Sequence, residues 1–371
     1  MLTNLPLKMV IMITYLSHWD WILYKSRKDL IPHIKSYEIH AMCPDGDYIK
    51  ELKSIYKSNT SWEIKRNKVI DIKAILMLRR HIKKVESNFH CFTLKTGILF
   101  SLADIFLKNK NKAVLSITGL GFLFSNGFKA QILRILIKPF IKYLFNKSFN
   151  IIIFQNKSDE EIFLKFSSFS NNTKIIQSSG LEKSNFKIRE NIQDKKMKKK
   201  VILISRLLYD KGIIDYLSLI SKVNNDNFEF YLAGKRDQGN PQNITNKDMT
   251  KILKTRNLQY LGEIDVETEL SKFDISIIMS SHEGFSRILL ESLYVGLYCL
   301  AYRIQGTEVM KEFKHLQLIE LNEIDKFANY IENFTDIDDN SHNRMLVDKL
   351  YTSKVVASQI ENTYNELDSL D

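Results

Sequence analysis

Short runs of apolar residues alternate along this chain with longer stretches in which apolar and polar residues recur at helical spacing. The short runs have the length of buried strands, and the longer stretches have the period of amphipathic helices. This alternation is typical of parallel sheets with crossover helices. Strands are predicted in two series, at Met9–Thr14, Glu38–Met42, Ala113–Ile117 and Ile151–Phe154, and then at Lys200–Ile204, Phe228–Leu232, Ile275–Met279 and Tyr298–Tyr302.

The two series of predicted strands indicate two domains. A chain of 371 residues is longer than a single core usually supports. The polar, lysine-rich segment Lys187–Lys200 lies between the two series and is predicted to be a linker. We therefore expect an α/β protein with two Rossmann-like, doubly wound parallel-sheet domains, residues 1–180 and 181–371. Ligands of such domains bind beyond the carboxyl ends of the strands.

Charge is divided unevenly between these two domains. Residues 1–180 contain 28 Lys and Arg against 13 Asp and Glu, a net charge of +15, whereas the remainder carries −4. No acidic residue occurs between Asp104 and Asp159. A basic domain joined to a mildly acidic one indicates that the first domain faces an anionic partner.

The centre of this acid-free window, residues 127–147, is a basic amphipathic segment. Its mixture of apolar residues and cations is typical of a helix that lies on anionic lipid. The alternative is an ordinary surface helix whose apolar side packs on the sheet. Pro139 is predicted to divide the segment into two shorter helices. The cations are Lys129, Arg134, Lys138, Lys142 and Lys147.

Neither a membrane-spanning helix nor a signal peptide is predicted. No uncharged apolar run reaches the roughly 18 residues that a spanning helix needs. The apolar stretch Leu7–Trp19 is followed by a charged helix and not by a cleavage site, so we interpret it as a buried strand. Three widely spaced cysteines, Cys43, Cys91 and Cys299, form no disulfide framework. These features favour a soluble or peripheral protein of the reducing cytosol.

The stretch Ser280–Ser292, SSHEGFSRILLES, contains the first candidate site. It follows a predicted strand, and a helix is predicted over Arg287–Val295 with Ser286 as its N-cap. Backbone N–H groups from Gly284 to Arg287 would point out of this helix start. They would form an anion site that needs no charged side chain.

Two glutamates flank this helix start. Glu291 lies in the first turns, where a side chain leans back toward the N-terminus and can accept hydrogen bonds from a ribose diol. Glu283 lies on the loop and faces the other end of a bound sugar nucleotide. The alternative is that Glu283 is a surface residue and that Glu291 only stabilises the helix dipole.

A second candidate site follows the strand predicted at Lys200–Ile204. Arg206 comes at the strand end, and Lys211–Gly212 opens the next helix. Two cations beside a glycine fit a pyrophosphate, to which each charge-assisted hydrogen bond contributes about 1.5–3 kcal/mol. The alternative is that these two cations bind no ligand. A lysine at a helix N-terminus is unfavourable because the helix dipole is positive there, so this alternative explains the sequence less well than a bound pyrophosphate does.

In order and spacing, these elements resemble the donor domain of family-4 glycosyltransferases. The resemblance rests on Arg206 with Lys211–Gly212, FYLAGKRDQGNP, LQYLGE and EGFSRILLE. Members of that family are retaining, metal-independent enzymes of the GT-B architecture, with two Rossmann-like domains that face each other across a cleft. The resemblance therefore implies no metal and no cofactor, only a UDP-sugar as co-substrate.

The resemblance implies a role for each matching residue. Arg206 and Lys211 would bind the donor diphosphate, and Glu291 the ribose. Glu283 would hold the transferred sugar with the amides of Gly284 and Phe285. The helix start at Ser286 and Arg287 would stabilise the departing diphosphate. The backbone of the LQYLG segment, at Tyr260 and Gly262, would line the base pocket.

The first half is similar to the branch of that family that extends lipid-linked sugars. The matching segments are HWDWILYKSR, FTLKTG, ITGLGFLFSNG, FQN and SSGLEKSNF. Many members carry a histidine after the strand near residue 117, where this chain has Thr118, with Gly119 and Gly121 after it. Thr118 or Lys95 is the candidate to replace that histidine on the acceptor side.

The resemblance implies transfer of a hexose or N-acetylhexosamine from a UDP-sugar to an undecaprenyl-diphosphate-linked saccharide, in the synthesis of an O-antigen or capsule. The partners would be the donor, the lipid-linked acceptor and the anionic inner face of the cytoplasmic membrane. A C-terminal helix is expected over 349–367, which in relatives crosses back onto the first domain.

Other classes fit the sequence less well. Turn chemistry explains Asp45 and Asp47, and the eight histidines have no zinc spacing. A nucleic-acid-binding protein would explain the pI of about 9.2 but not the acidic second half with its diphosphate-type site. A UDP-sugar 2-epimerase shares the architecture but would not need a membrane-facing basic helix.

Overall fold

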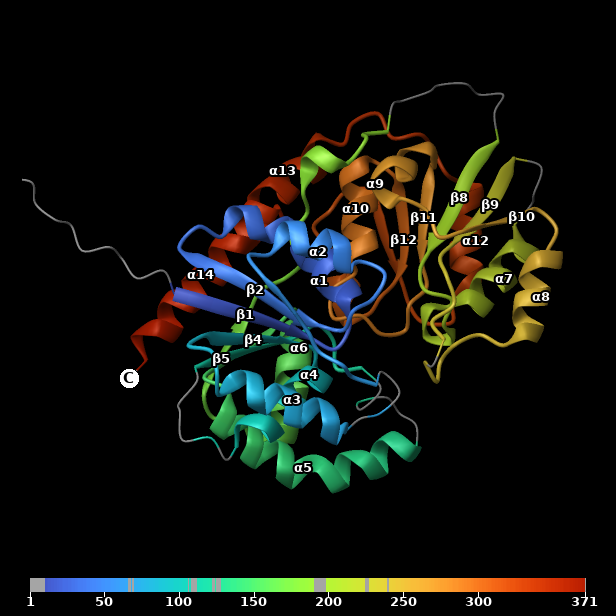
Figure 1. The fold of residues 1–371 in the computed structure, drawn as a ribbon. Helices are drawn as coiled ribbons and strands as arrows, with labels where there is room; N and C mark the ends of the chain where they lie inside the picture. The colour runs from blue at the N-terminus through green and yellow to red at the C-terminus, as the bar shows by residue number, and fades with distance from the viewer. Residues whose placement is uncertain are drawn as a thin grey trace, which may run out of the picture. The chain divides into compact units, whose positions relative to one another are not determined.

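The chain forms two compact units, Met1–Gly180 with Ser353–Asp371 and Leu181–Thr352. The computed structural model (Figure 1) describes residues 11–65, 68, 70–105, 107, 112–121, 124, 128–189, 198–223, 227–238 and 240–370. Side chains of residues 128–130, 133 and 136 are not described. We expected residues 181–371 to form the second domain, with a C-terminal helix that crosses back onto the first, and the structure groups Ser353–Asp371 with the first unit.

The first unit is built on a seven-stranded parallel sheet in the order β3-β2-β1-β4-β5-β6-β7. Its strands are β1 Ile11–Ser17, β2 Tyr37–Cys43, β3 Asn59–Ser61, β4 Asn88–Phe92, β5 Ala113–Ile117, β6 Ile151–Phe154 and β7 Asn172–Ile175. Its helices are α1 Asp20–Arg27, η1 Lys28–His33, α2 Ile49–Ile55, α3 Ile72–Ile82, α4 Leu94–Asp104, α5 Phe128–Ser148, α6 Lys157–Ser167 and α14 Ser353–Ser369.

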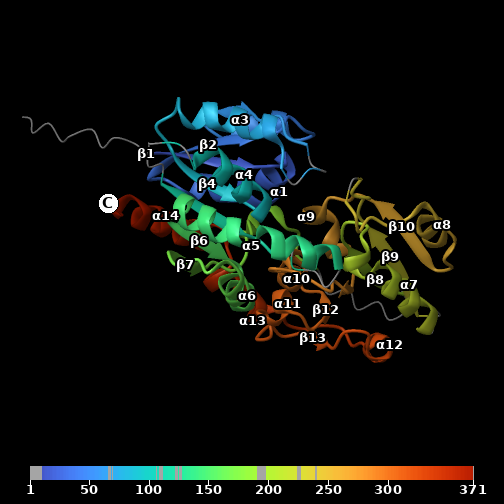
Figure 2. The ribbon, with the colours of Figure 1, turned by 90° about the horizontal axis from the view of Figure 1, so that it is seen from below.

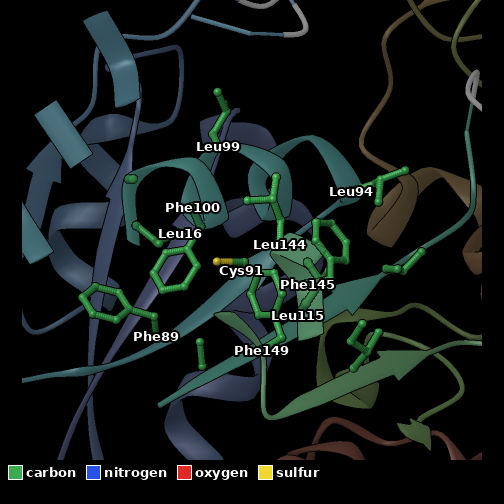
Figure 3. Close-up of a cluster of buried hydrophobic side chains, with 14 of the residues drawn as sticks. Leu16, Phe89, Cys91, Leu94, Leu99, Phe100, Leu115, Leu144, Phe145 and Phe149 are labelled. Carbon is green, nitrogen blue, oxygen red and sulfur yellow. The ribbon is translucent and has the colours of Figure 1, made fainter. Parts of the chain in front are cut away.

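Helices cover both faces of this sheet because alternate strand residues point to opposite sides. Phe89 and Cys91 of β4 and Leu115 of β5 pack into a core with α3, α4, α5 and α6 (Figures 2 and 3). On the other face, Ile13 and Tyr15 of β1 pack with α1, η1, α2 and α14. Burial on both faces explains why β5 and β6 are nearly continuous apolar runs in the sequence.

The helix α14 is part of the core of the first unit. Its Tyr364 is fully buried, and its hydroxyl lies 2.6 Å from His90 Nδ1 and 2.9 Å from the Tyr15 hydroxyl. At the surface, Glu361 Oε1 accepts hydrogen bonds of 2.8 Å from the amides of Lys35 and Ser36. Both the apolar and the polar contacts of α14 therefore belong to the first unit.

The second unit is built on a six-stranded parallel sheet in the order β10-β9-β8-β11-β12-β13. Its strands are β8 Lys199–Ile204, β9 Phe228–Ala233, β10 Leu258–Gly262, β11 Ile275–Ile278, β12 Tyr298–Tyr302 and β13 Leu316–Ile319. Its helices are η3 Lys183–Asn185, η4 Tyr209–Lys211, α7 Ile213–Lys222, α8 Asn246–Lys254, α9 Val266–Glu269, η5 Leu270–Lys272, α10 Arg287–Val295, α11 Gln305–Glu308, α12 Ile324–Glu332 and α13 Ser341–Leu350.

The two faces of this second sheet are also covered. Helices α7, α8 and α12 pack on one face and α10 and α13 on the other. The prediction of two Rossmann-like, parallel-sheet α/β domains is confirmed. All eight predicted strands match observed ones, although Met9 and Val10 lie outside the described residues. The prediction missed β3, β4, β7, β10 and β13.

The prediction that Pro139 divides the basic segment was wrong, because α5 continues through it. A proline inside a helix costs about 3 kcal/mol. The inner side of α5 buries Ile141, Leu144 and Phe145 in the core, and each buried side chain of this kind contributes about 1.5–3 kcal/mol. Packing therefore outweighs the lost backbone hydrogen bond.

Candidate functional site

The second sheet reverses its strand order between β8 and β11. From β8 the chain proceeds through β9 to β10 on one side, and from β11 through β12 to β13 on the other. Loops that leave the carboxyl ends of two such neighbours diverge and leave a crevice in which ligands of doubly wound sheets bind. These two loops carry Arg206 and Lys211 after β8 and Ser280–Ser286 after β11.

An ion pair connects the two loops at this switch point. Lys211 Nζ lies 2.8 Å from Glu283 Oε1, and the two side chains are only 11% and 22% exposed. Beside it, the Ser281 amide and hydroxyl donate to the Asp210 carbonyl at 2.8 and 3.2 Å. The structure therefore brings together the cation and the carboxylate that the sequence placed 72 residues apart.

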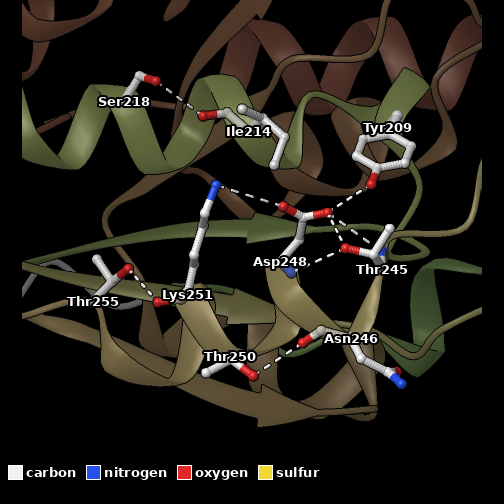
Figure 4. A network of polar contacts seen from close by, with 9 residues as sticks. All are labelled: Tyr209, Ile214, Ser218, Thr245, Asn246, Asp248, Thr250, Lys251 and Thr255. Carbon is white, nitrogen blue, oxygen red and sulfur yellow. Dashed lines mark hydrogen bonds and ion pairs between the residues drawn. The ribbon is translucent and has the colours of Figure 1, made fainter.

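The loop that carries Lys211 is held from both sides. Gly212 has a φ of +72°, and a Cβ there would lie 2.3 Å from the Met279 carbonyl oxygen, so only glycine fits. On the other side, the Tyr209 hydroxyl donates to Asp248 Oδ2 at 2.6 Å (Figure 4). Hydrogen bonds from Thr245 and Tyr209 lower the pKa of Asp248 and keep it an acceptor. These contacts fix the backbone from which Lys211 extends.

Arg206 is positioned by a residue to which the sequence analysis gave no role. Its Nη1 lies 2.7 Å from Oδ2 of Asp237, a carboxylate that is 4% exposed, whereas the arginine side chain is 38% exposed. Asp237 follows β9, the neighbour of β8, in the FYLAGKRDQGNP segment. An acidic residue just beyond a strand end was the signal that could have identified it.

The helix α10 begins as predicted, with Ser286 in the N-cap position, but the serine side chain does not cap it. Its amide donates to the Gly306 carbonyl at 3.0 Å and so is used within the protein. Its hydroxyl is buried and has no hydrogen-bond partner among the described residues. A Cβ on Gly306 would lie 2.4 Å from the Glu283 carbonyl oxygen, so the two loops are in close contact there.

The other predicted donor residues lie on α10 and at its start. Glu291 is 7% exposed, and its Oε1 lies 2.6 Å from Arg287 Nε, one turn away. Phe285 packs its ring in the core, with the Tyr351 ring centroid at 5.6 Å, so only its backbone can contact a ligand. Gly284 lies on the loop between Glu283 and this buried ring.

The segment predicted to line a base pocket is on β10, the edge strand of the sheet. Tyr260 is half-buried, and its hydroxyl donates to the Gly234 carbonyl at 2.8 Å. The Gly234 amide in turn donates to the Gly262 carbonyl at 2.6 Å. The carboxyl ends of β9 and β10 are therefore hydrogen-bonded to each other, two and three strands away from β11.

The predicted acceptor residues are spread over two elements of the first unit. Thr118, Gly119 and Gly121 follow the carboxyl end of β5, with Thr118 half-buried. Lys95 lies in the first turn of α4, and its Nζ donates to the Lys65 carbonyl at 3.0 Å.

The outer side of α5 is exposed and combines apolar and basic residues. Lys138 and Lys142 are exposed, and Arg134 is half-buried with its guanidinium 5.9 Å from the Phe124 ring. Lys129 lies in α5, but its side chain is outside the described part. Large apolar side chains stand exposed on the same helix, namely Ile132 (44%), Ile135 (74%), Phe140 (66%) and Tyr143 (61%).

Among the described residues, no group of three His, Cys, Asp or Glu side chains is placed to hold a metal ion. No helix in the described ranges has the length and apolar character that crossing a bilayer requires.

Residues 184–347 match the family described as glycosyl transferases group 1, and this range lies within the second unit. No curated protein matches the sequence significantly.

Solved structures match over almost the whole chain. A sucrose-phosphate synthase from Thermosynechococcus elongatus is 14% identical with a TM-score of 0.78, covering 97% of this chain and 100% of its own. A glycosyltransferase from Rickettsia africae is 15% identical with a TM-score of 0.76, covering 98% and 100%. HepE of Anabaena, solved with UDP and glucose, is 16% identical with a TM-score of 0.75, covering 96% and 99%. The second unit therefore carries a glycosyltransferase group 1 domain, which makes the chain a glycosyltransferase, and its two parallel-sheet Rossmann-like units have the GT-B fold.

Proposed function

We propose that this chain is a retaining, metal-independent family-4 glycosyltransferase that moves a hexose or N-acetylhexosamine from a UDP-sugar to an undecaprenyl-diphosphate-linked saccharide. The product would serve the assembly of a surface polysaccharide such as an O-antigen or capsule. The observation that carries the proposal is the meeting of Lys211 and Glu283 at the switch point of the second sheet, beside Arg206 and the start of α10.

This arrangement suits a sugar that is joined to a diphosphate. A cation and a carboxylate 2.8 Å apart match a ligand whose phosphate and sugar hydroxyls are neighbours. The buried hydroxyl of Ser286 lacks a partner among the described residues, and a phosphate oxygen would supply one. HepE, which shares this fold, was solved with UDP and glucose, and this supports UDP as the carrier.

In the proposed reaction, the bond between the anomeric carbon and the β-phosphate oxygen breaks. The acceptor hydroxyl oxygen bonds to that carbon on the same face, and its proton passes to a β-phosphate oxygen. Arg206, Lys211 and the N-terminus of α10 stabilise the charge that develops on the departing diphosphate. Glu283 orients the sugar and stabilises the oxocarbenium-like state. Because Glu283 also binds Lys211, it keeps this cation in place before the donor arrives.

The acceptor side and the membrane contact are assigned to the first unit. Four large apolar side chains of α5 are exposed among cations, a combination that binds to anionic headgroups and inserts into the acyl boundary. A lipid-linked acceptor would require a peripheral location of this kind, on the cytoplasmic face of the membrane. Thr118, Gly119, Gly121 and Lys95 are the proposed acceptor contacts.

The test is a donor screen that follows nucleotide release from UDP-, GDP- and dTDP-sugars, with a short prenyl-diphosphate saccharide as acceptor. We expect UDP release that depends on the acceptor and a product with retained anomeric configuration. Calorimetric titration with UDP alone provides a measurement that does not require the correct sugar. No heat of UDP binding would contradict the proposal. Conversion of a UDP-sugar to its 2-epimer without an acceptor would identify an epimerase instead.

A further inference from the structure

A groove of about 630 Å³ lies between α7 and α8 of the second unit. Its volume is in the range of sites that bind small molecules. It does not include the loops after β8 and β11, so it is separate from the site described above. The residues that line it are Leu217, Lys247, Thr250, Lys251, Lys254 and Thr255.

Three of these residues are lysines that share one side of α8. Lys247, Lys251 and Lys254 are four and three positions apart, so they lie on the same face of the helix, and all three are exposed. Because a helix rises 1.5 Å per residue, the first and the last are about 10 Å apart along its axis. Residues 246–256 contain four Lys and Arg against one Asp, within a half of the chain that carries −4. The groove is therefore a locally positive place in an acidic domain.

Helix stability does not explain all three lysines. Lys251 and Lys254 lie in the last turn, where a cation is favourable to the helix dipole. Lys247 lies in the first turn, where a cation is unfavourable. Among the described residues, neither Lys247 nor Lys254 has a hydrogen-bond or ion-pair partner. Other exposed lysines of this unit do pair with an acid, as Lys222 does with Asp325. An anionic ligand would supply the missing partners.

The remaining lining offers little to an anion. Leu217 of α7 is half-buried and apolar. The Thr250 hydroxyl donates to the Asn246 carbonyl at 3.0 Å, and the Thr255 hydroxyl donates to the Lys251 carbonyl at 2.8 Å. Both hydroxyl protons are thus used within α8, and the alkyl stems of the lysines add further apolar surface. Apolar walls with ammonium groups at the rim suit an organic body that carries anionic groups.

One lysine of the groove is connected to the loop that carries Lys211 (Figure 4). Lys251 Nζ lies 3.8 Å from Asp248 Oδ1, and Asp248 Oδ2 accepts from the Tyr209 hydroxyl at 2.6 Å. An ion pair at this distance, with a lysine side chain that is 58% exposed, is weak, so a ligand in the groove can draw the ammonium group away. A carboxylate that loses a neighbouring cation is a stronger acceptor. Tyr209, and with it the backbone of Lys211, is then held more firmly.

We propose that the groove between α7 and α8 binds a soluble organic anion with two phosphoryl groups, and that this ligand strengthens binding of the donor. The phosphoryl groups contact Lys247 and Lys254 at the two ends of the groove, and the organic body packs on Leu217. Binding in the groove is independent of the proposed function. The effect on the donor rests on it, because it takes Lys211 as a donor contact.

Calorimetry tests the groove with fructose 1,6-bisphosphate, whose phosphoryl groups lie at opposite ends of the sugar, and with fructose 6-phosphate, which has only one. The full chain is first saturated with UDP, so that the switch point of the second sheet is occupied. We expect the bisphosphate to bind with 1:1 stoichiometry and the monophosphate to bind at least tenfold more weakly. Equal affinities, or no heat from the bisphosphate, would overturn the inference.

Lysine variants locate the binding. Lys247→Gln/Lys254→Gln should weaken bisphosphate binding at least tenfold. The matched control is Lys272→Gln/Lys326→Gln, which removes the same charge from two lysines of this unit that are each 59% exposed and paired with an acid three residues away. The control should bind as wild type. An equal loss in the two double variants would indicate general attraction by charge and would overturn the inference.

Turnover and vesicle binding complete the test. The bisphosphate should lower the KM for the UDP-sugar at least twofold in the wild type and have no effect on the KM of Lys247→Gln/Lys254→Gln. Binding that leaves the wild-type KM unchanged would overturn the coupling and leave the groove. If the double variant loses binding to anionic vesicles and the bisphosphate does not bind, α8 contacts lipid and the inference is wrong. If UDP does not bind, the proposed function fails, and the same titration without UDP still tests the groove.

Discussion

The two units share a topology and differ in the chemistry at their switch points. Both sheets are parallel and reverse their strand order between the first and the fourth strand of the series, β1 and β4 in one and β8 and β11 in the other. In the second unit an ion pair, Lys211 with Glu283, spans the reversal. In the first unit, His18 Nδ1 and Thr93 Oγ1 make the contact between the two strand ends, 3.0 Å apart.

This difference shows which part of the architecture carries function. The sheet fixes where two loops meet, and the loop residues decide what is bound there. A pair of opposite charges suits a diphosphate joined to a sugar, whereas the contact in the first unit is made by an imidazole and a hydroxyl. Four predictions test this difference between the two units, starting with the largest expected effect.

Loss of the ion pair should abolish most turnover. Lys211→Ala and Glu283→Ala should each reduce kcat/KM for the UDP-sugar at least tenfold, or about 1.4 kcal/mol, because each removes a group that contacts the donor. Lys222→Ala is the control, since this lysine of α7 pairs with Asp325 at an exposed position. Near-normal rates in both variants, with circular dichroism showing intact folding, would remove the charged switch point from the mechanism.

Reversal of charge on α5 should release the protein from membranes. The triple variant Arg134→Glu/Lys138→Glu/Lys142→Glu is expected to move from the vesicle pellet to the supernatant, because each cation near an anionic surface contributes about 1 kcal/mol. The matched control reverses three lysines of α8 in the second unit, Lys247, Lys251 and Lys254, and should sediment as wild type. Equal behaviour of the two triple variants would show that α5 has no special role.

Acid should destabilise the first unit. Burial lowers the pKa of His90 well below its ordinary value of 6.5, and nearby Arg27 lowers it further. The folded state therefore holds this histidine neutral, whereas the unfolded chain takes up a proton near pH 6.5. Stability is thus full above that pH and is lost as the pH falls.

Amide hydrogen exchange, measured between pH 7.5 and 5.5, reports the loss of stability separately for each unit. Protection should fall in β1, β4 and α14, which surround His90, and a His90→Phe variant should show a weaker pH dependence. His40 and His81, whose pKa values burial also lowers, add to the effect in the same direction. Protection in the first unit that does not change with pH would contradict this account.

Relief of strain at Thr93 should stabilise the first unit slightly. Glycine adopts a φ of +79° without a side-chain clash, so Thr93→Gly is expected to raise the free energy of unfolding by about 1 kcal/mol. Thr93→Ser, which keeps a side chain and a hydroxyl at this φ, is the control and should change the free energy of unfolding less. Chemical denaturation measures both variants, and a clear loss of stability in Thr93→Gly would show that this conformation is not strained.

The sequence predicted the regular part of this fold well. The strands Ala113–Ile117, Ile151–Phe154 and Tyr298–Tyr302 were predicted with their observed bounds, because each is an apolar run buried on both faces. The helix Arg287–Val295 also has its predicted bounds. The strand β4, NFHCF, was missed because a histidine and a cysteine interrupt its apolar pattern, and their burial depends on partners distant in the sequence.

From the sequence, site residues could be predicted on single loops and the helices that follow them, but contacts between different loops could not. Arg206, Lys211 and Glu283 lie on loops that follow strands, and Glu291 lies one turn into the next helix, so their order and spacing made them candidates. The contact of Arg206 with Asp237 and that of His18 with Thr93 depend on which strands are neighbours. Because β4 was not predicted, nothing in the sequence indicated that residues 75 positions apart would meet.

The place of α14 has a consequence for synthesis. A ribosome produces residues 1–180 long before residues 353–369, yet Tyr15 and His90 are covered by Tyr364 from that last helix. In the nascent chain, part of the apolar surface of the first unit therefore stays exposed while the whole second unit is translated and folds. During that interval the first unit depends on chaperones or on its own residual stability, because α14 completes the core of that unit only after the second unit has been made.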